Sequence, residues 1–271
     1  RPPRSTLFPY TTLFRSTMLK TGIFVDAENI RMCGGYGMRY DVLAELGSCG
    51  GSTLLRANSY LAEDGERTKD DAEYRQKLYR YHDVIRQCGF KVIKKYVKHF
   101  VDDEGIITTK ANADMDLAID ALLQARNLDR VILLTGDGDF IRLVLALQNM
   151  GCRVEVIGFK YVSSELREAA DLVTSGYLIP GLLPIGAPAG ENRQRGIAIS
   201  YNQDRGFGFM RYYSLGRDGL VPHSVFFHCS KAPEINDTLF LDSTNIFEFS
   251  IVKNQDNNSR TEAWDIHLVN G

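Results

Sequence analysis

Apolar runs alternate with helical patterns along the first two thirds of the chain. Five runs have the length and composition of strands in a protein core. They lie at residues 21–29, 52–62, 91–97, 131–135 and 152–159. Charged or amphipathic stretches that predict helices lie between them, at residues 40–46, 69–88, 114–126 and 140–150. Because strands that alternate with helices build a parallel sheet with both faces covered, the pattern predicts an α/β fold.

The pattern changes near Pro180. The stretch PGLLPIGAPAGENRQ is rich in Pro and Gly and has few side chains able to pack, which favours a linker. From Gly196 onward, short β runs are separated by Gly and Asn, a pattern typical of a small all-β barrel. We therefore expect four segments. They are a leader at 1–17, an α/β domain at 18–178, the linker at 179–194 and the barrel at 195–271.

The leader begins RPPRSTLFPYTTLFRS and has neither a helical nor a strand period, nor the continuous apolar core of a signal peptide. Part of it resembles the translation of a sequencing adapter, so Met18 is the expected start of the native chain. The alternative is a genuine disordered arm. In either case, we expect the leader to contribute nothing to the fold.

Composition narrows the classes of function. The residues are 44% hydrophobic and 24% charged, as in ordinary globular proteins, and the net charge is −2. A nucleic-acid site must therefore be a local patch or be bridged by a metal ion. The five cysteines never form a CxxC pair, which argues against a zinc knuckle and a disulfide framework and suits a reducing cytoplasm. No apolar run approaches the roughly 18–20 residues needed to span a membrane, so we expect no membrane partner.

Acidic residues follow the predicted strands at the positions where α/β folds bind ligands. Asp26 ends the first strand, and Asp137 and Asp139 come directly after the fourth. Asp114 opens the helix that precedes the fourth strand. The carboxyl ends of parallel strands meet at one edge of the sheet, so we expect these acids to converge. Converging carboxylates repel one another unless a cation compensates them, and Mg²⁺ or Mn²⁺ is the natural partner of oxygen ligands.

Each acid also has a purely structural interpretation. Asp114 could favour a helix N-terminus, and Asp137 could cap the helix that follows it. Asp120 could pair with Arg126 or Arg130 on a solvated face, and a DGD sequence is often only a turn. Acids at two separate strand ends, with a third cluster between them, favour a metal site over these alternatives.

Three blocks of sequence carry a family resemblance: GIFVDAENI, KANADMDLAIDAL and VILLTGDGDFIRLVLALQNMGCRVEVIGF. Together they resemble the NYN domain of LabA-like proteins, a PIN-like ribonuclease fold, across about residues 21–175. The resemblance implies a metal-dependent ribonuclease. It implies that the catalytic, metal-binding residues are Asp26, Asp114, Asp137 and Asp139, with Asn29, Asp120 and Thr135 close to them. The family often has Lys-Gly-Val-Asp where this chain has Lys-Ala-Asn-Ala-Asp, so no role is carried over to Lys110.

A basic region with interleaved aromatic residues spans residues 66–99. Lys and Arg contact phosphates, and unpaired bases stack on aromatic rings. For single residues, a solvated helix face with i,i+4 charge pairs is the stronger interpretation. For the region as a whole, we expect RNA contacts that include Lys94 and Lys95.

The predicted barrel interleaves aromatic residues with Gly and single basic residues. Alternate side chains of a strand share a face, so Phe207 points the same way as Phe209, and Phe226 the same way as His228. Such a row can stack on single-stranded bases, although rings of this kind are also common in a core. The order of residues from 196 to 269 resembles a cold-shock domain, an OB-type barrel that binds single-stranded RNA or DNA.

The cold-shock resemblance implies a set of nucleic-acid-binding residues. They are Tyr201, Phe207, Phe209, Phe226 and His228. Two positions depart from the family, because Ser200 replaces the usual Trp and Ile199 replaces a common Lys. One stacking ring and one phosphate contact are lost, so we expect a lower affinity.

The main hypothesis is a soluble, cytoplasmic, Mg²⁺- or Mn²⁺-dependent endoribonuclease, with a PIN-like parallel sheet flanked by helices and a C-terminal OB-type barrel that tethers RNA. A second hypothesis is a non-catalytic RNA-binding regulator with a vestigial acidic pocket. A third is a Toprim-like DNA nuclease, in which the first-strand acid should be Glu rather than Asp26. The run from Gly34 to Gly37 lacks the spacing of a phosphate loop and predicts a turn. The sequence leaves open whether the chain forms a homodimer.

Overall fold

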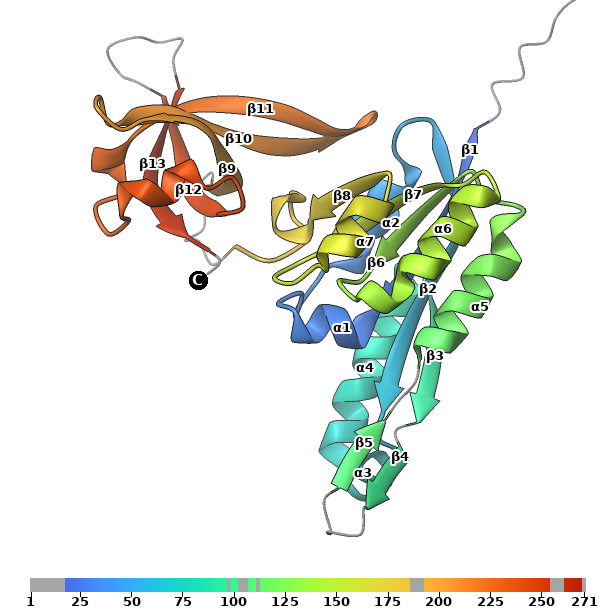
Figure 1. The fold of residues 1–271 in the computed structure, drawn as a ribbon. Helices are drawn as coiled ribbons and strands as arrows, with labels where there is room; N and C mark the ends of the chain where they lie inside the picture. The colour runs from blue at the N-terminus through green and yellow to red at the C-terminus, as the bar shows by residue number, and fades with distance from the viewer. Residues whose placement is uncertain are drawn as a thin grey trace, which may run out of the picture.

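The computed structural model describes residues 18–96, 98–101, 107–110, 113–185, 193–253 and 261–269. The predicted leader lies outside these ranges. Two units are visible in Figure 1, a helix-flanked sheet and a barrel, which confirms the predicted fold class. Within the described ranges, none of the helices combines the length and the apolar character that crossing a membrane requires.

The first unit is built on six parallel strands. In sheet order they are β3 (Lys91–Tyr96), β2 (Ser52–Glu63), β1 (Leu19–Asp26), β6 (Arg130–Leu134), β7 (Arg153–Gly158) and β8 (Leu172–Ser175). The chain first adds strands on one side of β1 and later returns to place β6 on its other side. The strand order therefore reverses between β1 and β6, and such switch points open a crevice at the carboxyl ends of the strands.

Helices cover both faces of the sheet (Figure 1). One face carries α1 (Ala27–Met32), α2 (Tyr40–Ser48), α3 (Gly65–Asp70) and α4 (Ala72–Gln87), and the other carries α5 (Asp114–Ala125), α6 (Ile141–Asn149) and α7 (Ser164–Ala169). Successive side chains of β1 point to opposite faces of the sheet, so the strand contributes to both cores. Ile23 and Val25 pack on the α1–α2 side, and Phe24 packs on the α5–α6 side. A fully apolar strand is needed because both of its faces are buried.

The region predicted as a single helix at 69–88 is divided into α3 and α4. Asp71 lies between them with extended backbone, and its carboxylate accepts a hydrogen bond from the Tyr74 N–H at 2.9 Å. This N-cap satisfies a backbone donor that has no partner within the helix, so α4 starts anew at Ala72. Two further elements follow β3, the antiparallel strands β4 (Lys98–Val101) and β5 (Ile107–Lys110).

The second unit is a closed five-stranded barrel. Its strands are β9 (Arg193–Asn202), β10 (Phe207–Gly216), β11 (Gly219–His228), β12 (Phe247–Lys253) and β13 (Thr261–Leu268), joined in the cyclic order β10-β11-β13-β12-β9. The pairing is antiparallel except between β11 and β13. Phe227, Phe247 and Phe249 fill the interior. Closure pairs every strand on both sides, and the architecture is that of an OB-type barrel.

Part of the segment predicted as a linker packs in the first unit. Ile179, Leu182 and Leu183 are buried in the core on the α1–α2 face. The Leu182 carbonyl also accepts a hydrogen bond from the Arg39 N–H at 2.9 Å, just ahead of α2. The Pro and Gly content predicted an unpacked chain. The segment packs nevertheless, because it has three large apolar side chains within five residues and these join the core that contains α1 and α2.

The hairpin of β10 and β11 extends from the barrel toward the sheet unit (Figure 1). Leu215 and Leu220, near its turn, pack against the α1–α2 core. The backbone N–H of Gly50 donates to the Arg217 carbonyl at 2.8 Å. The two units are therefore joined by apolar packing and a backbone hydrogen bond as well as by the chain itself.

Candidate active site

The crevice between β1 and β6 brings three of the predicted acids to one edge of the sheet. Val25 pairs with Leu134 in the parallel register, so Asp26 lies beside Thr135, where β6 ends. The turn that carries Asp137 and Asp139 begins one residue later. Acids far apart in sequence thus meet because both strands end at the topological switch point.

Asp26 is the buried member of the group, with an exposed fraction of 5%. One carboxylate oxygen accepts the Asn29 N–H at 3.2 Å and caps α1, and the other accepts the Thr135 hydroxyl at 3.3 Å. Burial, and then the charges of Asp114 and Asp137, raise the pKa of Asp26 to about 6 despite these hydrogen bonds. Burial is the larger cause of this shift, and the carboxylates of two other elements add to it.

The turn after β6 is held by contacts from β1 and α1. The Asn29 side-chain oxygen accepts the Gly136 N–H at 2.8 Å, and the Thr135 hydroxyl accepts the Asp137 N–H at 3.2 Å. A Cβ on Gly136 would collide with the carbonyl oxygen of Tyr161, so only glycine fits. Asn29 and Thr135 therefore position the acidic turn, and their place in a catalytic site stays a prediction.

Asp137 also has a local structural role. Its carboxylate accepts the Asp139 N–H at 3.0 Å and caps the short 3₁₀ helix Gly138–Phe140. The capping interpretation of Asp137 is thus realised, but one of its oxygens takes no part in that contact. Asp139 is exposed at the same turn.

Asp114 approaches from the start of α5. Partial burial, and then the charges of Asp137 and Asp139, raise its pKa above the ordinary value. No side-chain cap is formed at the N-cap residue Ala113. Asp114 is electrostatically coupled to the acidic turn, as expected if the four acids share one crevice.

Asp120 lies one helical turn or more beyond Asp114 and is fixed by a contact that the sequence did not predict. The Tyr60 hydroxyl donates to its carboxylate at 2.9 Å and accepts from the Asn58 side chain at 3.0 Å. Arg130, a candidate partner for Asp120, instead pairs with Glu155 at 2.6 Å. The sequence signal for this contact is that Asn58 and Tyr60, two residues with polar groups, occupy alternate positions of β2 and so share one face.

The donor chemistry of the four acids fits a hard divalent cation. Among the residues that the structure describes, no three His, Cys, Asp or Glu side chains are grouped as a ready-made metal cage. Mg²⁺ does not require one, because it usually keeps several waters and binds through one or two carboxylates. A cation would also relieve the repulsion that raises the pKa values of Asp26 and Asp114.

The two lysines expected to contact RNA both have carboxylate partners. Lys94 pairs with the buried Glu63 at 2.9 Å, and Lys95 pairs with Asp116 at 2.8 Å. Lys95 therefore lies near the first turn of α5 and hence near Asp114. These pairs reduce the charge that either lysine can offer to a phosphate, and their RNA contacts stay a prediction.

Four of the five predicted barrel residues form one surface. Phe207 pairs with His228 and Phe209 pairs with Phe226 across β10 and β11. The Phe226 ring lies 5.7 Å from that of Phe207 and 5.9 Å from that of Phe209. We call these four residues the aromatic face. Ser200, where the related family has Trp, pairs with Phe209 and so lies at its border.

Tyr201 is not part of the aromatic face. It pairs with Gly208, and its ring stacks on the buried Phe227 with centroids 5.7 Å apart. Its hydroxyl donates to Asp237 at 3.3 Å. The alternation of β9 turns Tyr201 toward the barrel interior, away from the face that carries Phe209.

A family model for the NYN domain matches residues 20–179, more than half of the chain. This chain belongs to the NYN family. The family is one of the PIN-like nuclease families, so membership supports a nuclease-related role. The matched range covers the whole sheet unit and every acid of the crevice.

Individual proteins are also similar to this chain. The chain is 29% identical over 94 residues to the low amplitude and bright protein LabA of Synechococcus elongatus. This alignment covers 34% of the chain and 50% of LabA, so the chain spans about half the length of the curated relative. A crystal structure of a protein of unknown function from Vibrio parahaemolyticus is 27% identical, with a TM-score of 0.47, and the match covers 58% of this chain and 93% of that one.

Proposed function

We propose that this NYN protein is a divalent-metal-dependent ribonuclease that cuts RNA in the crevice between β1 and β6. The observation that carries the proposal is that Asp26 at the end of β1 lies close enough to Asp114 and Asp137, on two other elements, for their charges to add to the effect of burial on its pKa. A buried carboxyl with a raised pKa lowers the stability of the folded state. Functional sites retain such groups because a bound ligand offsets the lost stability.

The residues have separate tasks in this proposal. Asp26, Asp114, Asp137 and Asp139 would hold Mg²⁺ or Mn²⁺, which when bound supplies an activated water and neutralises charge on the scissile phosphate. Thr135 and Asn29 hold the acidic turn against β1. Tyr60 orients Asp120 on α5, so that the carboxylate stays at the crevice rather than on the solvated helix face.

The barrel supplies RNA binding in the same proposal. Its aromatic face offers stacking surfaces to single-stranded bases, and Phe209 is 43% exposed. The turn of the hairpin that carries this face contacts the sheet unit at Gly50, just ahead of β2, so RNA held by the barrel stays attached to the nuclease unit. Tethering raises the effective concentration of RNA, so weak barrel binding is sufficient.

The test is the substitution Asp137→Asn in the full chain. Labelled single-stranded, hairpin and duplex RNA should be cut by the parent in Mn²⁺ but not by the variant, while RNA affinity stays within a few fold. The substitution keeps the oxygen that caps the 3₁₀ helix, so the fold should survive. Cleavage retained by the variant and still inhibited by EDTA would remove Asp137 from the metal site.

The second candidate function is that of a non-catalytic RNA-binding regulator. It is favoured by the capping roles of Asp26 and Asp137, which give both acids a structural purpose. The two functions differ in a thermal shift. A ribonuclease should gain thermal stability in Mn²⁺, and Asp137→Asn should abolish that gain, whereas a regulator with structural acids should show no difference between parent and variant.

A further inference from the structure

A deep pocket lies on the α1–α4 face of the sheet, next to the acidic crevice. It encloses about 640 Å³, within the range of small-ligand sites. Its wall is formed by α1, the loop before α2, the end of β2, and α3 and α4. Ala27 and Glu28 line it and directly follow Asp26, so pocket and crevice share the start of α1.

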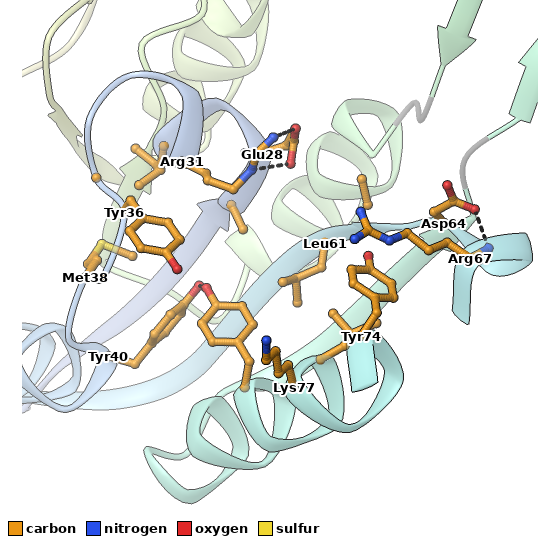
Figure 2. Close-up of a pocket in the computed structure, with 17 residues that line it drawn as sticks. Glu28, Arg31, Tyr36, Met38, Tyr40, Leu61, Asp64, Arg67, Tyr74 and Lys77 are labelled. Carbon is orange, nitrogen blue, oxygen red and sulfur yellow. Dashed lines mark hydrogen bonds and ion pairs between the residues drawn. The ribbon is translucent and has the colours of Figure 1, made fainter. Parts of the chain in front are cut away.

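Four tyrosines give the pocket its aromatic surface, and we call it the tyrosine pocket (Figure 2). They are Tyr36, Tyr40, Tyr74 and Tyr81. Tyr40 is almost fully buried at 3%, whereas Tyr36 is 81% exposed, so the rings line the pocket from its floor to its mouth. The ring of Tyr40 is edge-on to that of Tyr81, and their hydroxyls are 3.4 Å apart. The tyrosine pocket therefore combines flat apolar walls with hydroxyl groups.

Charged groups surround these rings. Three cations and two carboxylates line the tyrosine pocket. Two of the cations, Lys77 and Arg67, also pair with the carboxylates of Glu73 and Asp71. Arg67 lies over the Tyr74 ring at 4.3 Å, and Arg31 pairs with Glu28 (Figure 2). Lys77 also lines the pocket, and in the sequence of α4 it lies between Tyr74 and Tyr81. Planar apolar walls with a cationic rim match a nucleotide, in which a flat base carries an anionic phosphate.

We propose that the tyrosine pocket binds one unpaired base of the RNA strand that the acidic crevice cuts. The base stacks on the rings of Tyr74 and Tyr81, and the adjoining phosphate meets Arg31, Arg67 or Lys77. Glu28 already accepts two hydrogen bonds from Arg31, and Asp64 caps α3, so the rings and the cations are the groups that meet the nucleotide. This inference rests on the proposed ribonuclease function and adds to it the path of the strand next to the scissile phosphate.

The occupancy of the tyrosine pocket is tested by photo-crosslinking. The full chain carrying Asp137→Asn is mixed, without metal, with single-stranded RNA that has one 5-iodouridine placed at successive positions. Irradiation should join at least one position to peptides that contain Tyr36, Tyr74 or Tyr81. Adding Tyr74→Ala should lower that yield about fivefold or more, the loss expected for one base–aromatic stack, whereas Tyr74→Phe should retain it.

Tyr79→Ala is the matched control, because Tyr79 is an exposed tyrosine of the same helix that does not line the pocket. Equal losses from Tyr74→Ala and Tyr79→Ala, or crosslinks confined to the barrel or to β3, would overturn the inference. The crosslink needs neither metal nor cleavage. If the Asp137→Asn chain crosslinks in the pocket but the parent never cuts RNA in Mn²⁺, the proposed function alone is refuted. If the parent cuts RNA but the Asp137→Asn chain gives no such crosslinks, the pocket alone is refuted.

Discussion

At the scale of single residues, Asp26 connects the fold to the chemistry. Its carboxyl is buried at the end of β1, and its pKa is raised from 3.8 to about 6. The folded chain thus binds the proton more tightly than the unfolded chain does. Above the raised pKa, the charged form costs the folded state up to about 3 kcal/mol. The cost is absent below the unfolded pKa and grows as the pH rises through this window.

We predict that Asp26→Asn makes the protein more stable at neutral pH by about 1–3 kcal/mol. Asparagine keeps one oxygen for the Asn29 N–H and removes the buried charge. The gain should shrink as the pH falls from 6 and should approach zero below the unfolded pKa of 3.8, where the parent carboxyl becomes protonated in both states. Urea unfolding of parent and variant in EDTA at several pH values measures the difference. A gain that does not change with pH would mean that burial does not perturb this carboxyl.

At the scale of secondary-structure elements, the pairing of β10 with β11 builds a surface from four residues that are separated in sequence. The register sets Phe209 opposite Phe226 and Phe207 opposite His228. Gly208, between the two phenylalanines of β10, is where β9 approaches closely, because a Cβ there would collide with the Ser200 carbonyl. Successive residues of β10 point to opposite sides of the strand, so Gly208 faces the barrel interior and the two phenylalanines beside it face outward.

We predict that Phe209→Ala weakens binding of single-stranded RNA to the full chain by about 1–3 kcal/mol, because one stacking ring is lost. Val221→Ala is the control, since Val221 is similarly exposed at 39% but lies near the turn of the same hairpin. Fluorescence anisotropy of labelled RNA, at one fixed salt concentration, measures both affinities. Equal affinity of the two variants would show that the aromatic face does not contact RNA.

At the scale of the whole molecule, the contact of the β10–β11 hairpin with the sheet unit sets the barrel relative to the crevice. Leu215 and Leu220 pack against the same core as α1 and α2, and the Arg217 carbonyl accepts the Gly50 N–H. The Arg195 guanidinium adds a hydrogen bond to the Pro184 carbonyl at 3.0 Å. The contact is small, so a single buried charge should be able to break it.

We predict that Leu215→Asp separates the two units without unfolding either. The radius of gyration measured by small-angle X-ray scattering should increase, while the circular dichroism spectrum stays that of the parent. Ser224→Asp places the same charge at an exposed position of β11 and should leave the radius unchanged. If Leu215→Asp also left the radius unchanged, the hairpin would not be what holds the units together.

The sequence by itself determined the order of the elements, the α/β class and the change to a barrel, because each depends on local periodicity. It also indicated that Asp26 ends one strand and that Asp137 follows another, so both should lie at the edge of the sheet. The catalytic role of these acids remains a prediction, whereas the pairing of β1 with β6 places Asp26 beside the turn that carries Asp137.

Only the tertiary structure decided which groups meet across the fold. Composition marked residues 179–194 as linker, but Leu182 and Leu183 are buried in the same core as α1 and α2. The partner of Asp120 comes from β2 rather than from a neighbouring turn, and Tyr201 faces inward because of the closure of the barrel. The tyrosine pocket likewise gathers side chains from α1, β2 and α4. Local periodicity determines which residues of an element share a face. Long-range packing determines which other elements contact that face.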